Sequence, residues 1–259
     1  MLLGTGTVLT LGGGGFSMPE VHGADVSPLD TFLLSLTGKK RPKVCFVGTA
    51  SGDSASYAWR FLDAFAPRAE ASVLTLFGQA DFPFTPPEHL LTQDVVYVGG
   101  GSTANLLAIW RLHGLPEILR RAAADGTVLA GISAGMNCWF EGSSTDSFGP
   151  LAALPDGLGF LPGSACPHYF GEADRRAAYH RMVATGELPD GHAVDDGVAL
   201  LWRDGELVEV VSERPNGRAF RVTRQVIAAE PRAVEIPLPV RYLGDERDSP
   251  ARSGPKTRE

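Results

Sequence analysis

The amino-acid sequence predicts an α/β protein with a doubly wound, mostly parallel sheet flanked by helices, followed by antiparallel hairpins. Through the first half, short apolar runs alternate with longer amphipathic stretches, which is typical of βαβ units. Several of these runs end in glycine or small polar residues before a helix, as expected at the ligand-binding edge of an open sheet. After Phe140 the pattern changes to turns and short strands, which favours hairpins at the sheet edge.

Taken in order, the apolar runs predict strands at residues 7–11, 43–48, 71–76, 95–98 and 127–130. The stretches between them predict helices at residues 27–36, 54–66, 102–112 and 116–124. In the second helix, Tyr57, Phe61, Leu62 and Phe65 recur on one apolar face. The later strands are predicted at residues 198–202, 207–211, 219–222 and 233–237. We expect one domain over residues 1–243 and a disordered tail at 244–259, where no apolar residue is larger than alanine.

Composition excludes several classes of protein. The chain has 259 residues, of which 44% are hydrophobic and 20% charged, as in ordinary globular proteins. Its net charge of −7 offers no basic patch for nucleic acid. The sequence contains no long apolar run and no basic leader, so we expect neither a membrane span nor a signal peptide.

The three cysteines are Cys45, Cys138 and Cys166, an odd number without the spacing of a disulfide framework or a zinc site. A reducing, cytoplasmic location is therefore expected, with no cofactor and no metal. Cys45 lies in an apolar run, where a thiol behaves as a small buried hydrophobe.

The most informative motif is residues 131–135, with the sequence Gly-Ile-Ser-Ala-Gly. Gly-x-Ser-x-Gly is the pattern of a nucleophile elbow, in which a strand turns sharply into a helix and exposes the serine. The two glycines remove side chains that would clash in such a turn. Because the motif directly follows an apolar strand, Ser133 is the candidate nucleophile.

A serine hydroxyl needs a base, usually an imidazole that a carboxylate orients. His168 follows a segment that ends a strand, and it is the favoured base; a purely structural role beside Pro167 is the alternative. His192 begins a strand and is the weaker candidate. The other four histidines are expected at the surface: His22, His89, His113 and His180.

The acid and the oxyanion donors are less sharply indicated. Asp195 and Asp196 stand between two apolar runs; Asp196 can orient the imidazole, and a simple Asp-Asp-Gly turn is the alternative. Backbone amides of the glycine-rich residues 99–101, together with the amide of Ala134, can stabilise an oxyanion. Glycine-rich loops also bind phosphates, but no dinucleotide fingerprint or P-loop lysine is present, so the nucleotide interpretation ranks low.

Four segments, in this order, resemble the peptidase E (aspartyl dipeptidase) and cyanophycinase group of serine peptidases: residues 98–107, 131–137, 166–169 and 193–197. The resemblance spans roughly residues 5 to 210 and implies the fold of class I glutamine amidotransferases. It makes Ser133 the nucleophile and His168 the general base. It also places the amides of Gly100 and Ala134 in the oxyanion hole.

The resemblance leaves two choices open. The third catalytic position is often glutamate in peptidase E, whereas the matching residue here is Asp196, with Asp195 and Asp146 as alternatives; Asp146 is also a candidate for substrate binding. Arg175 and Arg176 stand at a spacing similar to that of the family's substrate arginine, and a guanidinium can bind a carboxylate through two hydrogen bonds. The alternative is that both arginines are merely solvated.

The activity implied by the resemblance is hydrolysis of a small peptide partner, a dipeptide with an N-terminal aspartate. One alternative is a cyanophycinase-like hydrolase of the aspartyl-arginine polymer. Glutamine amidotransferase chemistry would need a cysteine where Ser133 stands, and Cys138, five residues later, is expected to face the core. Another alternative is a non-catalytic domain that binds a small molecule. Because members of the group are commonly dimers, a homodimer or higher homo-oligomer is expected.

Overall fold

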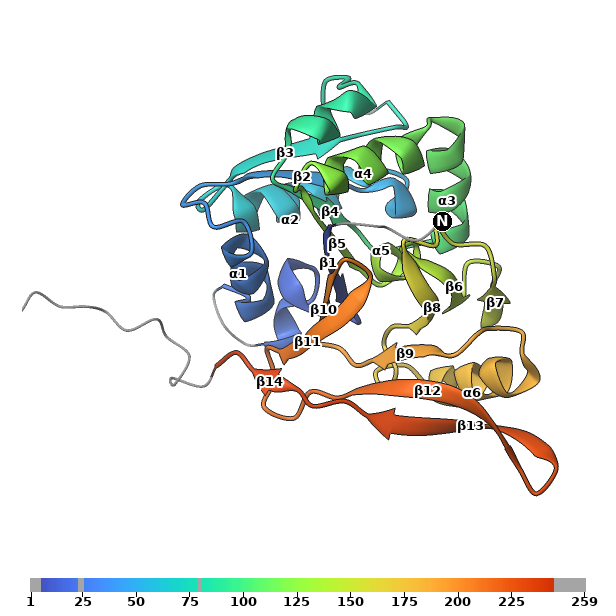
Figure 1. The fold of residues 1–259 in the computed structure, drawn as a ribbon. Helices are drawn as coiled ribbons and strands as arrows, with labels where there is room; N and C mark the ends of the chain where they lie inside the picture. Colours follow the sequence, from blue (N-terminus) through green and yellow to red (C-terminus); the bar gives the residue numbers. More distant parts are fainter. Residues whose placement is uncertain (1–5, 23–25, 79–80, 245–259) are drawn as a thin grey trace, which may run out of the picture.

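The computed structural model describes residues 6–22, 26–78 and 81–244, and these form two β-sheets with helices packed against them (Figure 1). The predicted tail lies outside the described residues except for Gly244, and the prediction of a single domain stays a prediction. Within the described ranges, no helix is long and apolar enough to cross a membrane.

The first sheet has, among the described residues, eight strands in the order β14-β11-β10-β1-β5-β4-β2-β3. The strands from β1 to β3 in this order pair in parallel, whereas β10 runs antiparallel to β1 and to β11. Their bounds are β1 Thr7–Leu11, β2 Lys43–Val47, β3 Glu70–Leu74, β4 Val95–Val98, β5 Val128–Ile132, β10 Val198–Arg203, β11 Glu206–Ser212 and β14 Arg241–Tyr242. The predicted parallel strands are thus confirmed to within two residues at each end.

Helices cover both faces of this sheet, as a doubly wound fold requires. Successive strand residues point to opposite faces, so Val8 packs in one core cluster and Leu9 in the other. α1 (Pro28–Ser35) and α2 (Ala55–Phe65) pack on the Leu9 side, and α3 (Thr103–Leu112) and α4 (Leu115–Ala124) on the Val8 side. The 3-10 helices are η1 Gly15–Ser17, η2 Pro19–Val21, η3 Thr49–Ser51 and η4 Pro87–Thr92.

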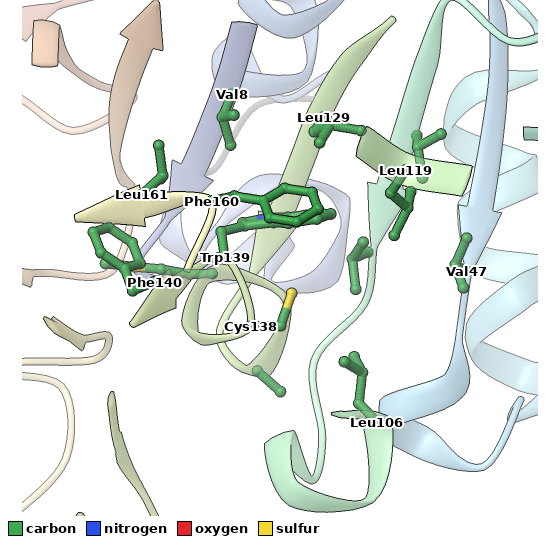
Figure 2. Packing of buried hydrophobic residues seen from close by; sticks show 14 of the residues in the cluster. Val8, Val47, Leu106, Leu119, Leu129, Cys138, Trp139, Phe140, Phe160 and Leu161 are labelled. Atoms are coloured by element: carbon green, nitrogen blue, oxygen red, sulfur yellow. The ribbon is translucent and has the colours of Figure 1, made fainter. Parts of the chain in front are cut away.

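The Val8 side of the sheet also supports the segment after β5. Trp139 and Phe160 lie against each other, with ring centroids 5.7 Å apart, and pack beside Leu129 of β5 (Figure 2). Cys138 is buried in the same cluster, as predicted. This packing holds in place the short helix α5 (Ala134–Asn137) that follows the candidate nucleophile.

The second sheet was not predicted. Within the described chain it has six strands in the order β13-β12-β9-β8-β6-β7, with α6 (Arg175–Thr185) packed on it. Its strands are β6 Phe140–Thr145, β7 Ala152–Leu154, β8 Leu161–Cys166, β9 Gly191–Val194, β12 Ala219–Ile227 and β13 Glu230–Pro237. The expectation that all the later hairpins join the edge of one sheet is therefore wrong for β12 and β13, which form a longer hairpin than predicted (Figure 1). Sequence periodicity does not report which sheet a strand joins, because that choice depends on long-range pairing.

Candidate active site

The junction of β5 and α5 has the geometry of a nucleophile elbow. Ser133 stands between the two elements with φ 57° and ψ −114°, a conformation that costs a non-glycine residue about 1–3 kcal/mol. A side chain at Gly131 would overlap the backbone of Gly135, and one at Gly135 would overlap the carbonyl of Val98. Both glycines are therefore required by close backbone contacts, as the motif predicted.

The hydroxyl of Ser133 is half-buried and makes no hydrogen bond within the described part of the chain. Its backbone amide donates to the carbonyl of Leu11, at the end of β1, at 3.1 Å. One turn later, the Asn137 side chain donates to the hydroxyl of Thr103 at 3.3 Å and to the carbonyl of Ser144 at 3.2 Å. The backbone around the serine is thus fixed while its oxygen stays without a partner.

His168 and Asp196 form a pair beside this elbow. Nδ1 of the imidazole donates to Oδ1 of Asp196 at 2.5 Å, and the two side chains are 12% and 14% exposed. His168 follows β8 and has φ 52°, again in the left-handed region that disfavours side chains. Its Nε2 has no hydrogen-bond partner among the described residues, so a carboxylate orients one ring nitrogen while the other is left to exchange a proton.

The end of β1 links the serine to the pair. Leu11 accepts from the amide of Ser133, and the next residue, Gly12, accepts from the amide of His168 at 3.2 Å. Consecutive Cα atoms are only about 3.8 Å apart, so both residues are held at the same strand end. A side chain at Gly13 would overlap the carboxylate of Asp196 and would lie 3.1 Å from Nδ1 of the imidazole.

The expected oxyanion donors also lie at this edge. A methyl group added at Gly100 would lie 3.7 Å from Oγ of Ser133, so this glycine is adjacent to the hydroxyl. Its amide donates to the hydroxyl of Tyr57 at 3.3 Å, a long bond that a better acceptor can replace. The amide of Ala134 is the first of α5, and such an amide has no acceptor within its own helix.

The three candidate carboxylates have different surroundings. Asp195 is buried, pairs with Arg218 at 3.0 Å and accepts from the amide of Phe170 at 3.0 Å; burial raises its pKa. Asp146 is exposed and lies beside an arginine rather than a histidine. Among the three, Asp196 is the one that contacts the imidazole of His168.

The two arginines also differ. Arg175 is buried; its Nε donates to Glu172 at 2.8 Å, and its Nη2 lies 4.0 Å from Oδ2 of Asp146. Arg176 is half-exposed and donates through Nε and Nη2 to the two carboxylate oxygens of Glu235, at 2.7 and 2.9 Å. Hydrogen bonding to this guanidinium is the largest effect that lowers the pKa of Glu235 to about 2.

His192 lies apart from these groups. It is buried on β9, with its ring 5.0 Å from that of Trp202 and 6.3 Å from that of Phe140. Burial lowers its pKa to about 4. The side chain of His180, which was expected at the surface, is 28% exposed, and its Nε2 shares Oε1 of Glu235 with the hydroxyl of Tyr169. The helical periodicity around His180 did not predict its contact with the carboxylate of Glu235 on β13.

The cysteine alternative has no support in the geometry. All three thiols are buried, and burial raises the pKa of Cys45 and Cys166 to about 12 and that of Cys138 well above its ordinary value. Sequence reasoning missed Tyr57 and Gly13. Tyr57 was read only as part of an apolar helix face, and nothing in the local sequence signals that its hydroxyl reaches Gly100.

Comparison with known proteins gives one family. The family model "Peptidase family S51" matches residues 8–210. The uncharacterized peptidase YgaJ of Bacillus subtilis (strain 168) is 46% identical over 238 residues, covering 92% of this chain and 99% of that protein. Peptidase E of Streptomyces coelicolor is 28% identical over 174 residues, covering 66% of this chain and 69% of that protein.

Solved structures agree on the fold. A peptidase from an acI-B1 actinobacterium has a TM-score of 0.63 at 16% identity and covers 90% of this chain and 97% of its own. A putative peptidase E protein from Listeria monocytogenes EGD-e has a TM-score of 0.56 at 17% identity and covers 79% of this chain and 97% of its own. At these identities the likeness concerns the α/β architecture.

Proposed function

Because the chain belongs to peptidase family S51, we propose that this peptidase uses Ser133 as its nucleophile and hydrolyses dipeptides that begin with aspartate. The observation that carries the proposal is the joint position of Ser133 and the His168–Asp196 pair. Their backbones bond to consecutive carbonyls at the end of β1, and neither the hydroxyl nor Nε2 has a hydrogen-bond partner among the residues that the structure describes. The name shared by two relatives, peptidase E, supports the substrate class.

In the proposed mechanism, Oγ of Ser133 attacks the scissile carbonyl while Nε2 of His168 takes the hydroxyl proton. Asp196 holds the ring through Nδ1 and stabilises the imidazolium. The amides of Gly100 and Ala134 donate to the oxyanion of the tetrahedral intermediate. The imidazolium then protonates the leaving amine, and a water molecule, activated by the same ring, hydrolyses the acyl-enzyme.

The aspartate side chain of the substrate needs a cationic partner, and we assign this role to Arg175. The Arg175 side chain is 4% exposed and its Nε and Nη2 share one oxygen of Glu172, whereas Arg176 is 52% exposed and its Nε and Nη2 bind both oxygens of Glu235. The partner of Arg175, Glu172, has a side chain that is 46% exposed, so it can move aside for a substrate carboxylate. Ser144 and Asp146 connect this guanidinium to Asn137, one turn beyond the nucleophile.

The first test is covalent labelling with a small fluorophosphonate. Wild-type protein should react at residue 133, and Ser133→Ala should not. Ser147→Ala, a serine beside α3, is the matched control and should label like the wild type. Failure of the wild type to label, together with no hydrolysis of any dipeptide, would refute the nucleophile assignment and favour the binding-domain alternative.

The second test is a substrate panel of dipeptides beginning with Asp, Glu, Asn and Ala, with the aspartyl-arginine polymer as a competitor class. We expect a preference for Asp over Asn of roughly 10²-fold or more, since the neutral amide of asparagine cannot replace the carboxylate of Glu172 as the charged partner of the guanidinium. Arg175→Ala should remove this preference, and Arg176→Ala, its neighbour on α6, should keep it. Faster turnover of the polymer than of any dipeptide would replace the proposed substrate with the cyanophycinase one.

A further inference from the structure

Two buried carboxylates lie behind the loop of residues 12–16, which follows β1. Asp30 on α1 is 1% exposed, and Glu213, directly after β11, is 3% exposed. Glu213 accepts from the amide of Gly15 at 2.9 Å and from the hydroxyl of Ser27 at 2.7 Å. Within the described ranges, Oδ1 of Asp30 has no hydrogen-bond partner. The two acids therefore contact the loop backbone at Gly14 and Gly15.

Gly12 and Gly13, at the start of the same loop, contact the histidine and its acid. The Gly12 carbonyl accepts from the amide of His168, and the Gly13 carbonyl accepts from the amide of Gly197 at 3.0 Å. Gly13 also packs directly against the carboxylate of Asp196. A shift of this loop would therefore move both members of the pair.

Ser17, the residue directly after the loop, contacts the other half of the site. The hydroxyl of Ser17 lies 2.5 Å from that of Tyr57, which accepts from the amide of Gly100 at 3.3 Å. One short segment thus spans from the imidazole to the candidate oxyanion donor. Misplacing catalytic groups by about 1 Å can cost 10²-fold in rate, so the support behind this segment matters for chemistry.

Stability alone does not explain the two acids. Apolar residues of similar size would usually stabilise a core as well as buried charged groups do. Burial, followed by the charge of Glu213, raises the pKa of Asp30 to about 7. Arg68 beyond α2 opposes this shift, and Tyr97 of β4 and Tyr57 of α2 also face the pair. A cavity of about 410 Å³ borders Asp30 on its outer side, lined also by His22, Asp63 and Arg68.

We propose that Glu213 and Asp30 are positioning residues, which hold the loop of residues 12–16 in the shape that keeps Asp196 against His168. Glu213 acts through its bond to the Gly15 amide, and Asp30 acts by packing against Gly15, where a Cβ atom would lie 2.9 Å from its Oδ1. This inference rests on the proposed function, because it assigns a purpose to the geometry of the same site.

Steady-state kinetics on an aspartyl dipeptide test the role of Glu213. Glu213→Ala should lower kcat by roughly 10–100-fold, as expected when a supporting hydrogen bond is lost, with KM changed by less than about threefold. Glu213→Gln keeps an acceptor for the Gly15 amide and should restore most of the rate. Glu206→Gln, an exposed glutamate on β11, is the matched control and should behave like the wild type. If Glu213→Ala fails to fold, Glu213→Asp, which cannot reach the amide, replaces it.

The pH profile tests Asp30. Above about pH 7 the acid ionises beside Glu213, and the repulsion should loosen the loop and lower kcat/KM in the wild type. Asp30→Asn carries no charge at any pH, so it should keep the activity measured at pH 6.5 and lose the alkaline decline. A fold-intact Glu213→Ala with wild-type kcat, or an Asp30→Asn profile identical to that of the wild type, overturns the inference.

A readout without substrate separates this inference from the proposed function. The short hydrogen bond between His168 and Asp196 should give a downfield imidazole N–H proton resonance that disappears in His168→Gln. Glu213→Ala should broaden or remove it, and Glu213→Gln should keep it. If the wild type neither labels nor hydrolyses peptides while this pattern holds, the proposed function fails and the positioning role stands. If the wild type is active and Glu213→Ala keeps the same imidazole resonance, the positioning role is refuted and the proposed function is not.

Discussion

His168 lies just after β8 and His192 lies on the neighbouring strand β9, and their surroundings differ in every respect that matters for catalysis. His168 has a strained backbone, a carboxylate on one ring nitrogen and a partly exposed ring. His192 has regular strand geometry and is buried beside Trp202, and its Nδ1 has no hydrogen-bond partner in the part of the chain that the structure describes. Burial alone therefore does not make a histidine useful for catalysis. A catalytic histidine needs one ring nitrogen that a partner orients and a second ring nitrogen that is open to the substrate.

The largest expected effect is at His168. His168→Gln should lower kcat/KM on an aspartyl dipeptide by about 10⁴–10⁶-fold, because loss of the base disables the nucleophile. The melting temperature should stay close to that of the wild type, since the ring is partly exposed. His192→Phe is the control and should keep kcat/KM within about threefold, a small effect by comparison with the loss of a triad member. A strong loss of turnover in His192→Phe with the fold intact would reverse the comparison.

Asp196→Asn comes next. An amide leaves the shape of the pair intact but favours the wrong imidazole tautomer, so kcat should fall by roughly 10³–10⁴-fold. Asp195→Asn removes a neighbouring carboxylate that pairs with Arg218, and it should change kcat far less. Equal losses in both variants, measured with the same dipeptide, would mean that Asp196 has no special relation to the ring.

His192→Ala should act on stability instead of turnover. Removing a buried ring beside Phe140 and Trp202 leaves a cavity, and we expect the free energy of unfolding to fall by about 2–4 kcal/mol. Urea titration followed by tryptophan fluorescence measures this change. His168→Ala should cost less than His192→Ala in the same titration, and the opposite order would contradict the assignment of core and site.

The pH dependence of stability separates the two histidines further. His192 has a folded pKa of about 4 against an ordinary value of 6.5, so in this window the unfolded chain binds a proton that the folded chain does not. Its contribution is complete above about pH 6.5 and is lost as pH falls to about 4, up to about 3 kcal/mol. The difference in free energy of unfolding between the wild type and His192→Phe, plotted against pH, should show this slope.

The contribution of Asp30 to stability depends on pH in the opposite direction. Its raised pKa favours the folded state most at pH below about 4, and this contribution declines as pH rises to about 7. Comparing variants, rather than the wild-type curve alone, therefore isolates the histidine. A difference curve without slope between pH 4 and 6.5 would show that the ring is hydrated in the native protein.

Local sequence was sufficient to predict the parallel strands of the first sheet and the elbow. The apolar runs from Thr7 to Ala130 each have the length and composition of a buried strand, and Gly131 and Gly135 are needed by contacts within the motif itself. His168 and Asp196 were favoured by their positions next to predicted strands and by resemblance to a family. The pairing of their side chains came only from the structure.

Local sequence could not predict the second sheet, the partners of His180 and Arg176, or the contacts that support residues 12–16. Glu235 lies on β13, far along the chain from the α6 residues that it binds. Ser27 and Glu213 are 186 positions apart in sequence yet hydrogen-bonded. No periodicity within either segment reports such contacts, because hydrophobic pattern specifies which face is buried and not which distant side chain meets it.

The sequence by itself determined the strand–turn–helix elbow around Ser133, the α/β alternation and the family, since these depend on residues close together in the chain. Only the tertiary structure decided which histidine is paired, which of three carboxylates pairs with it, and what holds the glycine loop behind them. The physical reason is that a buried polar group must find a partner somewhere in the folded molecule. The identity of that partner is set by the packing of whole elements against one another.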